Sequence, residues 1–563
     1  MSRARAWQCP LCLAGVIAFF FYYAFTNFVS AGRDDTFLML WSGQTLGSAP
    51  WFVNYNYELE EISSSIIGSL VSATTIGQPA GRALLMVKVM GLLAAAATLV
   101  LMWRSQDEFF KRDGMARWLT LGAVLATATS TPFSYWSLGG LETPYHALLL
   151  LLFTSYLVNH LSHVPENNRV HWGLAVSGIL LCLVRTEGFW PMFLALVAGL
   201  VIHGGMRKGH GAPVIKATAI SCFFFLLLLG LRTYYTGDLW PNPVYAKVGG
   251  FAEALPQGID YIYRYFRSSP WAWVQAAALL YGAIRLGLLL LARMAGRAPD
   301  AGSLVPATLA AVILCHLGFV ALTGGNWMEY FRFIAAVVPS LNLLALVAVG
   351  EMLALVRVQA GMPPMGRLAG LSACLLGSAL CLAQLRVVDP ENCATPVTRS
   401  VIAKGLAGVE DHVLSGNCAT RRDLAGIEPF IEANLSDYVR GGGRALSVIS
   451  YQAGFFPYYL RQRFTPRELI FTDTMGLSDK ATARILGEKG IYGNRLGARL
   501  DRVMMGSAGD LSKVVKERAP VMAYAPDASR ETRENFSKLG WKTVWDAPGG
   551  VVFYRDPSAT RTR

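Results

Sequence analysis

Long apolar runs separated by short polar segments occupy the first two thirds of the chain. An α-helix needs roughly 17 to 25 mostly apolar residues to cross a bilayer, and the pattern predicts about eleven such helices. The predicted spans lie near residues 10–32, 83–103, 116–136, 143–161, 172–187, 189–204, 216–233, 271–292, 304–323, 333–356 and 368–386. Residues 1–386 are therefore expected to form the transmembrane part of a polytopic α-helical membrane protein.

The pattern changes after residue 386, where apolar runs shorten and charged residues return. Strand-like stretches at 445–450, 468–472 and 520–524 alternate there with helical stretches at 423–439 and 480–488. Residues 387–563 are therefore expected to fold as a soluble C-terminal α/β domain. An odd number of spans places this domain outside the cytoplasm if the N-terminus is cytoplasmic.

Composition and charge agree with a membrane protein. Hydrophobic residues make up 53% of the chain and charged residues 15%, and the mean hydropathy is +0.38. The formal net charge of +13 would suggest nucleic acid in a soluble protein. Here the basic residues recur in alternate loops, near 104–117, 207–208, 293–297 and 357–367, as the positive-inside rule expects of cytoplasmic loops. We therefore expect a cytoplasmic N-terminus, contact with membrane lipid and no nucleic-acid partner.

The loops on the opposite side carry acids, aromatic residues and single cations. They are the segments 34–65, 138–142, 185–188, 234–247 and 324–332. Because these loops re-emerge on one face of the membrane, we expect one shared extracytoplasmic site. The chain has no Walker loop, no strand-to-helix GxGxxG, no CxxC pair and no HExxH. Nucleotide hydrolysis, dinucleotide redox chemistry and zinc chemistry therefore have no support.

Two adjacent aspartates follow the first span directly. Asp34 and Asp35 at a membrane boundary suit three roles: a base that takes a proton from a hydroxyl, a ligand of a divalent cation, or a cap for a helix beginning at Thr36. The other polar loops on the same face favour the base. Glu58 and Glu61 would share a face if their segment is helical, where they would either hold sugar hydroxyls or form a solvated acidic surface.

Two cations in these loops are candidates to hold a phosphate. The guanidinium of Arg332 has the fork geometry that suits phosphate, and Lys247 would act as a point charge. The alternative is that both mark the level of the lipid headgroups.

Acids and tryptophans near the helix ends also have two interpretations. Glu142 and Glu187 suit a sugar, although Glu187 has Arg185 beside it as an ion-pair partner. Trp240 and Trp327 suit stacking on a sugar, although tryptophan is ordinary at a membrane interface.

Together these motifs resemble a known family. They are Asp34-Asp35, VNYNYELEEISSS at 53–65, Gly140-Leu141-Glu142, Arg185-Thr186-Glu187-Gly188, GDLWPN at 237–242 followed by YAK at 245–247, and GGNW at 324–327 followed by Arg332-Phe333. In order and spacing, from about residue 30 to 340, they resemble the GT-C class of glycosyltransferases that use polyprenyl-phosphate sugars. Within that class the chain is most similar to the bacterial terminal arabinofuranosyltransferases.

The resemblance implies an inverting transfer of a sugar, arabinofuranose as the best match, from a polyprenyl-phosphate donor to a hydroxyl of a cell-envelope glycan or surface glycoprotein. It places the reaction in the first external loop, residues 33–82, with Asp34 or Asp35 as general base. The implied setting is a bacterial cytoplasmic membrane with a periplasmic C-terminal domain. The residues expected to hold sugar or acceptor are Glu58, Glu61, Glu142, Trp240, Asn242 and Trp327.

The remaining expectations concern cofactors, cysteines and rival functions. We expect no cofactor, although paired carboxylates would also suit a divalent metal. Cys393 and Cys418, the only cysteines beyond residue 386, are a disulfide candidate in an oxidising compartment. A lipid-linked sugar flippase or transporter and a non-catalytic carbohydrate-binding membrane protein stay as alternatives. A transporter would show internal repeats or paired broken helices and polar residues at both faces, and a binding protein would have no use for the aspartate pair.

Overall fold

The computed structural model describes most of the chain. The described residues are 3–30, 32–110, 116–162, 169–205, 211–247, 251–296, 301–326, 328–359, 397–415, 427–440, 445–451, 453–489, 500–506, 510–525, 528–547 and 550–555.

The first part of the chain is a bundle of helices. Its longer helices are α1 (Arg3–Phe28), α4 (Ala80–Arg104), α8 (Thr143–Ser162), α10 (Phe189–Gly205), α11 (Ala212–Thr236), α13 (Phe251–Arg267), α14 (Pro270–Met294), α15 (Ala301–Leu322) and α17 (Val338–Gln359). Shorter helices lie between them: α2 (Asp35–Gln44), α3 (Ile66–Ala73), α5 (Gln106–Phe109), α6 (Ala116–Ala128), α7 (Thr131–Ser137), α9 (Trp172–Val184), η1 (Thr186–Gly188), α12 (Asn242–Lys247) and α16 (Arg332–Ala335).

Six helices in the described part of the chain are long and apolar enough to cross a membrane. They cover Leu11–Phe28, Ala80–Arg104, Ala212–Thr236, Pro270–Met294, Ser303–Leu322 and Val338–Leu355. Apolar side chains are exposed on the outer faces of these helices: Leu280 is 64% exposed and Leu291 is 62% exposed. Such a surface is unfavourable in water and is what a helix presents to lipid. The prediction of a multi-pass membrane protein is confirmed at this level.

Two predicted spans are broken by the structure. The segment 116–136 is not one helix, because α6 ends at Ala128, Ser130 is extended, and Pro132 occupies the first turn of α7. The segment 333–356 divides into α16 and α17. Between 172 and 204 the tight turn predicted at 185–188 is present as η1. The predicted span at 368–386 lies outside the described residues.

The C-terminal part has a sheet surrounded by helices. Its elements are α19 (Arg399–Ala403), α20 (Gly405–Ser415), α22 (Ile427–Arg440), β1 (Leu446–Ser450), α23 (Phe455–Arg461), β2 (Leu469–Asp473), α24 (Lys480–Lys489), α25 (Leu500–Met505), α26 (Asp510–Glu517), β3 (Met522–Ala525), α27 (Arg530–Lys538), β4 (Lys542–Ala547) and β5 (Gly550–Tyr554). The strand order is β2-β1-β3-β5-β4. Strands β2, β1 and β3 are parallel, and β5 runs antiparallel to β3 and β4.

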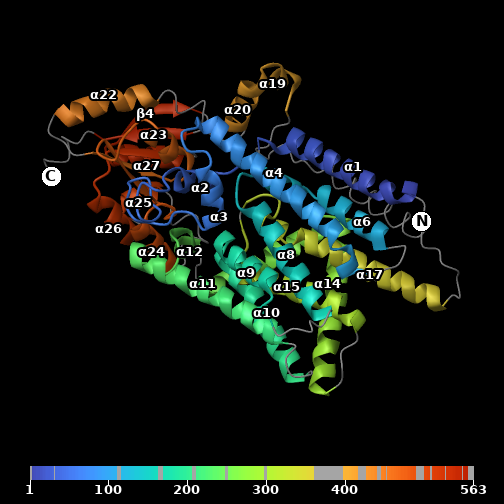
Figure 1. Ribbon diagram of the computed structural model, residues 1–563. Helices are drawn as coiled ribbons and strands as arrows, with labels where there is room; N and C mark the ends of the chain where they lie inside the picture. Colours follow the sequence, from blue (N-terminus) through green and yellow to red (C-terminus); the bar gives the residue numbers. More distant parts are fainter. Residues whose placement is uncertain are drawn as a thin grey trace.

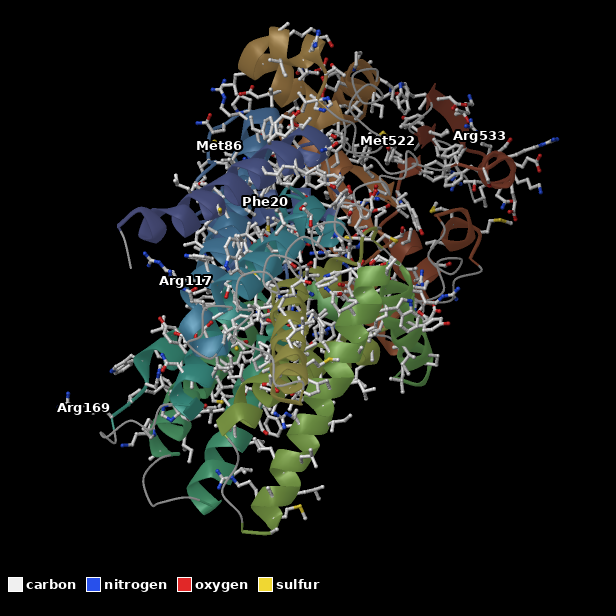
Figure 2. The ribbon with its side chains drawn as sticks, turned by 90° about the vertical axis from the view of Figure 1, so that its right-hand side faces the viewer. Phe20, Met86, Arg117, Arg169, Met522 and Arg533 are labelled. Atoms are coloured by element: carbon white, nitrogen blue, oxygen red, sulfur yellow. The ribbon has the colours of Figure 1, made fainter. Side chains whose placement is uncertain are left out.

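The sheet packs against one end of the helical bundle. In Figure 1 the sheet and its helices lie beside α2, α3 and α12, and α12 contacts α24 while α2 contacts α23. Figure 2 shows Met522 and Arg533 of this part on the opposite side of the molecule from Arg117 and Arg169 in the bundle. The first loop and the C-terminal part therefore meet at the end of the bundle that lies away from these two arginines.

Candidate active site

The two adjacent aspartates have different partners. Asp34 accepts two hydrogen bonds from main-chain N–H groups at the start of α23: Gly454 N to Oδ2 and Phe455 N to Oδ1, both 2.6 Å. The two segments of the chain approach so closely that a Cβ at position 454 would lie 1.9 Å from the carbonyl oxygen of Asp34, which explains the glycine at this position. Burial raises the pKa of Asp34 to about 7, although these hydrogen bonds oppose the shift. Asp34 therefore connects the bundle to the C-terminal part.

Asp35 begins α2 and faces two cations. Its Oδ2 lies 3.0 Å from Lys247 Nζ and 3.6 Å from Arg332 Nη1. Burial alone would raise the pKa of Asp35, but the charges of Lys247 and Arg332 together lower it below the ordinary value. The carboxylate is thus ionised and 14% exposed, which is the state of a group that can meet a ligand.

Arg332 is fixed from its other side by a buried row of charges. Its Nη2 lies 2.8 Å from Glu142 Oε1, and Glu142 also binds Arg185. Arg185 pairs in turn with Glu187, as the sequence allows, and its guanidinium lies 4.8 Å from the ring centroid of Phe333. Burial would raise the pKa of Glu142, but Arg332 and Arg185 lower it to about 2. Each charge in this row therefore has an opposite charge beside it, as burial requires.

The backbone before Arg332 is strained. Tyr330 and Phe331 have φ of 47° and 50°, in the left-handed region that bulky residues rarely enter. Trp136 Nε1 donates to the carbonyl oxygens of both Glu329 (3.1 Å) and Tyr330 (3.2 Å), which holds this turn in place. Strain that is retained by surrounding contacts is typical of functional sites, and here it directs Arg332 towards Asp35.

Glu58 and Glu61 do not share a helix face, so that prediction is wrong. Residues 53–65 form turns and extended chain. Glu61 makes a fully buried bidentate pair with Arg232 of α11, with Nε–Oε2 at 2.7 Å and Nη2–Oε1 at 3.0 Å. Glu58 is exposed and accepts from Asn54 Nδ2 at 2.7 Å. Because both oxygens of Glu61 are bound to Arg232, Glu61 anchors the loop to the bundle and does not face Asp35.

Glu60, between these two, meets the C-terminal part. Its Oε2 accepts from Asn242 Nδ2 at 2.9 Å and from the main-chain N of Lys480, at the start of α24, at 3.0 Å. Burial raises the pKa of Glu60 to about 7. Asn242, predicted to hold sugar or acceptor, therefore positions Glu60 and starts α12, the helix that ends with Lys247.

The other predicted site residues are placed as follows. Trp240 packs with Phe225, at a ring-centroid distance of 6.5 Å, in an apolar cluster that includes Cys182 and Met192. Trp327 and the disulfide candidates Cys393 and Cys418 lie outside the described residues. Within the described part of the chain, no group of three or more His, Cys, Asp or Glu side chains is arranged to hold a metal ion.

Several residues near the site could not be recognised from the sequence. Arg33 pairs with Glu329 and so ties the first loop to the turn before Arg332. Lys88 is completely buried in α4 and donates to the Leu138 carbonyl at 2.8 Å, which supports the turn that carries Glu142. A basic residue in an apolar helix was the only sequence signal for Lys88.

Solved structures of membrane glycosyltransferases have the same fold. No protein-family model matches the chain. It is similar to the Archaeoglobus fulgidus oligosaccharyltransferase in its apo form, with 11% identity and a TM-score of 0.54, over 93% of this chain and 70% of that chain. The oligosaccharyltransferase AglB from the same organism, in complex with an inhibitory peptide and a dolichol-phosphate, gives 10% identity and a TM-score of 0.52 over the same shares. The chain therefore shares the fold of these two oligosaccharyltransferase structures.

Two further similarities are weaker. ArnT from Cupriavidus metallidurans, bound to undecaprenyl phosphate, is 13% identical with a TM-score of 0.47, over 97% of this chain and 98% of that chain. Potassium transporter 19 from Oryza sativa subsp. japonica is 23% identical over 157 residues, which are 26% of this chain and 20% of the transporter. The chain thus spans about a fifth of the length of that curated relative.

Proposed function

We propose that this protein is a membrane glycosyltransferase that moves a sugar from a polyprenyl-phosphate donor to an acceptor hydroxyl, with Asp35 as general base. The proposal rests on one observation above all: Lys247 and Arg332, from two distant segments, meet on one oxygen of Asp35. A carboxylate for the acceptor proton and two cations for a phosphate are the groups that this reaction needs. The shared GT-C fold, whose AglB member was solved with a dolichol-phosphate, supports the same reaction class.

The chemical step is a single displacement. The acceptor oxygen forms a bond to the anomeric carbon, and the bond from that carbon to the phosphate oxygen breaks with its electron pair going to the phosphate. The acceptor proton passes to Asp35. One base suffices because polyprenyl phosphate is already a good leaving group, and base assistance of this kind is worth on the order of 10² to 10⁴ in rate. Attack opposite the departing phosphate inverts the anomeric centre.

Of the two aspartates, Asp35 is the better base. Both oxygens of Asp34 already accept main-chain N–H groups, so its carboxylate is not available to an acceptor. Glu142 and Arg185 serve as positioning residues that keep Arg332 beside Asp35. No metal is required in this scheme, because two cations already face the place where the phosphate charge develops.

We further propose that the sugar is arabinofuranose, that the acceptor is a cell-envelope glycan or surface glycoprotein, and that the site faces the periplasm of a bacterial cytoplasmic membrane. Motif resemblance supports the sugar. The positive-inside rule supports the orientation, because the basic residues Arg117 and Arg169 lie away from the site end of the bundle. The periplasmic C-terminal part, residues 387–563, would then position the acceptor.

Asp35→Asn tests the proposal directly. Transfer from a radiolabelled polyprenyl-phosphate sugar to a membrane extract should fall by about 10²- to 10⁴-fold, since the base is lost while the shape of the side chain is kept. The matched control is Asp546→Asn on the distant strand β4. It breaks an exposed ion pair with Arg533 and should keep full activity. Full transfer by Asp35→Asn would remove the base assignment, whereas an absence of transfer by the wild type itself would favour a flippase or a binding protein.

A further inference from the structure

We infer that Lys247 is an exchangeable counter-ion: it neutralises Asp35 while no donor is bound, moves to the donor phosphate when the donor arrives, and so frees Asp35 to act as base only then. This inference rests on the proposed function. It assigns an order of binding to the reaction, with the donor first and the acceptor second. It also gives the two cations different roles, because Arg332 stays beside Asp35 while Lys247 changes partner.

The two cations on Asp35 are held very differently. Arg332 is 5% exposed, binds Glu142 at 2.8 Å, contacts Met328 Sδ at 3.2 Å, and lies over the ring of Trp136. Its planar guanidinium is thereby fixed in orientation. Lys247 is 27% exposed and is the last residue of α12. A lysine ammonium on a flexible four-carbon stem can change partners by rotation alone, whereas a clamped arginine cannot.

A phosphate that enters the site brings a charge that a cation of the site has to meet. Three cations alternate with three carboxylates in one connected row, so the row is neutral before binding. The row runs Lys247, Asp35, Arg332, Glu142, Arg185, Glu187. A sugar-phosphate diester adds one negative charge in a poorly solvated place, where an unpaired charge is costly. Lys247 is the member of the row that can reach it without breaking the buried pairs.

The exchange also improves the base. With two cations beside it, Asp35 has a pKa below its ordinary value and is a poor proton acceptor. When Lys247 leaves, only Arg332 remains, at 3.6 Å, and the basicity of Asp35 rises.

Charge is then conserved through the step. The acceptor proton neutralises Asp35 as the breaking bond adds one negative charge to the phosphate, where Lys247 already lies. An acceptor that arrives without donor meets a masked base, which protects against unproductive proton transfer.

A binding experiment separates exchange from a structural role for the Asp35–Lys247 pair. The probe is undecaprenyl phosphate, titrated into the purified full-length protein in nanodiscs. If Asp35 competes with the phosphate for Lys247, Asp35→Asn should bind the probe about five- to tenfold more tightly than the wild type. If Asp35 instead holds Lys247 in the position that binds phosphate, Asp35→Asn will bind equally or more weakly, and the inference is overturned. Asp546→Asn is again the control and should bind as the wild type.

A second substitution makes the test quantitative. Lys247→Met should weaken binding, and the loss should be about five- to tenfold larger in the Asp35→Asn background than in the wild type, because the Asp35 carboxylate then no longer competes for Lys247. Equal losses in the two backgrounds mean that there is no competition and would also refute the exchange.

Wild-type kinetics keep the inference testable if Asp35→Asn fails to fold. Undecaprenyl phosphate should inhibit transfer noncompetitively against the acceptor, as expected when the donor site fills before the acceptor binds. An uncompetitive pattern against the acceptor, which requires the acceptor to bind first, contradicts this order. The transfer assay of Asp35→Asn decides the proposed function separately. If Asp35→Asn binds the probe more weakly and transfers no sugar, the exchange is refuted and the base assignment stands. If Asp35→Asn transfers sugar fully, the base assignment is refuted. If the wild type does not bind the probe, both are refuted.

Discussion

Replacing Asp34 by asparagine should loosen the attachment of the C-terminal part. The carboxylate accepts two main-chain N–H groups at 2.6 Å, and an asparagine keeps one acceptor oxygen while its NH₂ group faces the other donor. One charge-assisted hydrogen bond is lost, worth about 1.5 to 3 kcal/mol, and the other becomes a neutral one. The local cost is therefore at most about 2 to 4 kcal/mol at pH 8, where Asp34, with a pKa of about 7, is ionised, because removing the buried charge offsets part of the loss.

Hydrogen exchange measures this cost where it arises. Each 1.4 kcal/mol changes an opening equilibrium tenfold, so amide exchange across residues 454–461 should accelerate by up to roughly 30- to 700-fold in Asp34→Asn. Asp35→Asn is the matched control: it changes the adjacent residue in the same way, but Asp35 is bound to Lys247 and Arg332 instead of Gly454. Acceleration below about threefold in Asp34→Asn, or equal acceleration in both variants, would refute the division of roles between the two aspartates.

Two further predictions concern stability. Glu61→Gln leaves Arg232 without its buried counter-charge and should destabilise the protein by about 3 to 5 kcal/mol, read as a lowered Tm; an unchanged Tm would contradict the buried pair. Burial raises the pKa of Asp34 and of Glu60 to about 7 from ordinary values of 3.8 and 4.5, so between about pH 4.5 and 7 the folded protein holds more protons than the unfolded chain. The Tm should therefore fall as pH rises through this window. Asp34→Asn should flatten part of the slope, and a Tm that rises from pH 5 to 7 would count against these shifts.

Much of the helical architecture follows from the hydrophobic pattern. Runs such as 83–103 and 271–292 predict α4 and α14 to within a few residues, because a bilayer-crossing helix needs length and apolarity and little else. The breaks near Ser130 and at α16 were missed, since short polar or proline-containing interruptions weigh little against a long apolar average. Three strands, β1, β2 and β3, were placed to within two residues because each is a short apolar run between turns, whereas β4 and β5 were not predicted.

The composition of the site was more predictable than its contacts. The sequence singled out Asp35, Lys247, Arg332 and Glu142, and the structure brings these four side chains together. It gave Asp34 and Asp35 the same role, because the partner that distinguishes them is a main-chain N–H 420 residues away. Periodicity cannot reveal such a pairing, and main-chain donors have no signature in side-chain identity.

The main-chain N–H groups that bind Asp34 and Glu60 have a consequence for engineering. The contacts that Asp34 and Glu60 make with the C-terminal part reach peptide N–H groups at Gly454 and Lys480, which every residue except proline possesses. A foreign sheet domain grafted after the bundle would therefore preserve both attachments if it presented two helix starts at the same spacing and kept glycine at position 454. If the C-terminal part positions the acceptor, as we propose, such chimaeras would exchange acceptor preference and keep the transfer chemistry proposed for the bundle.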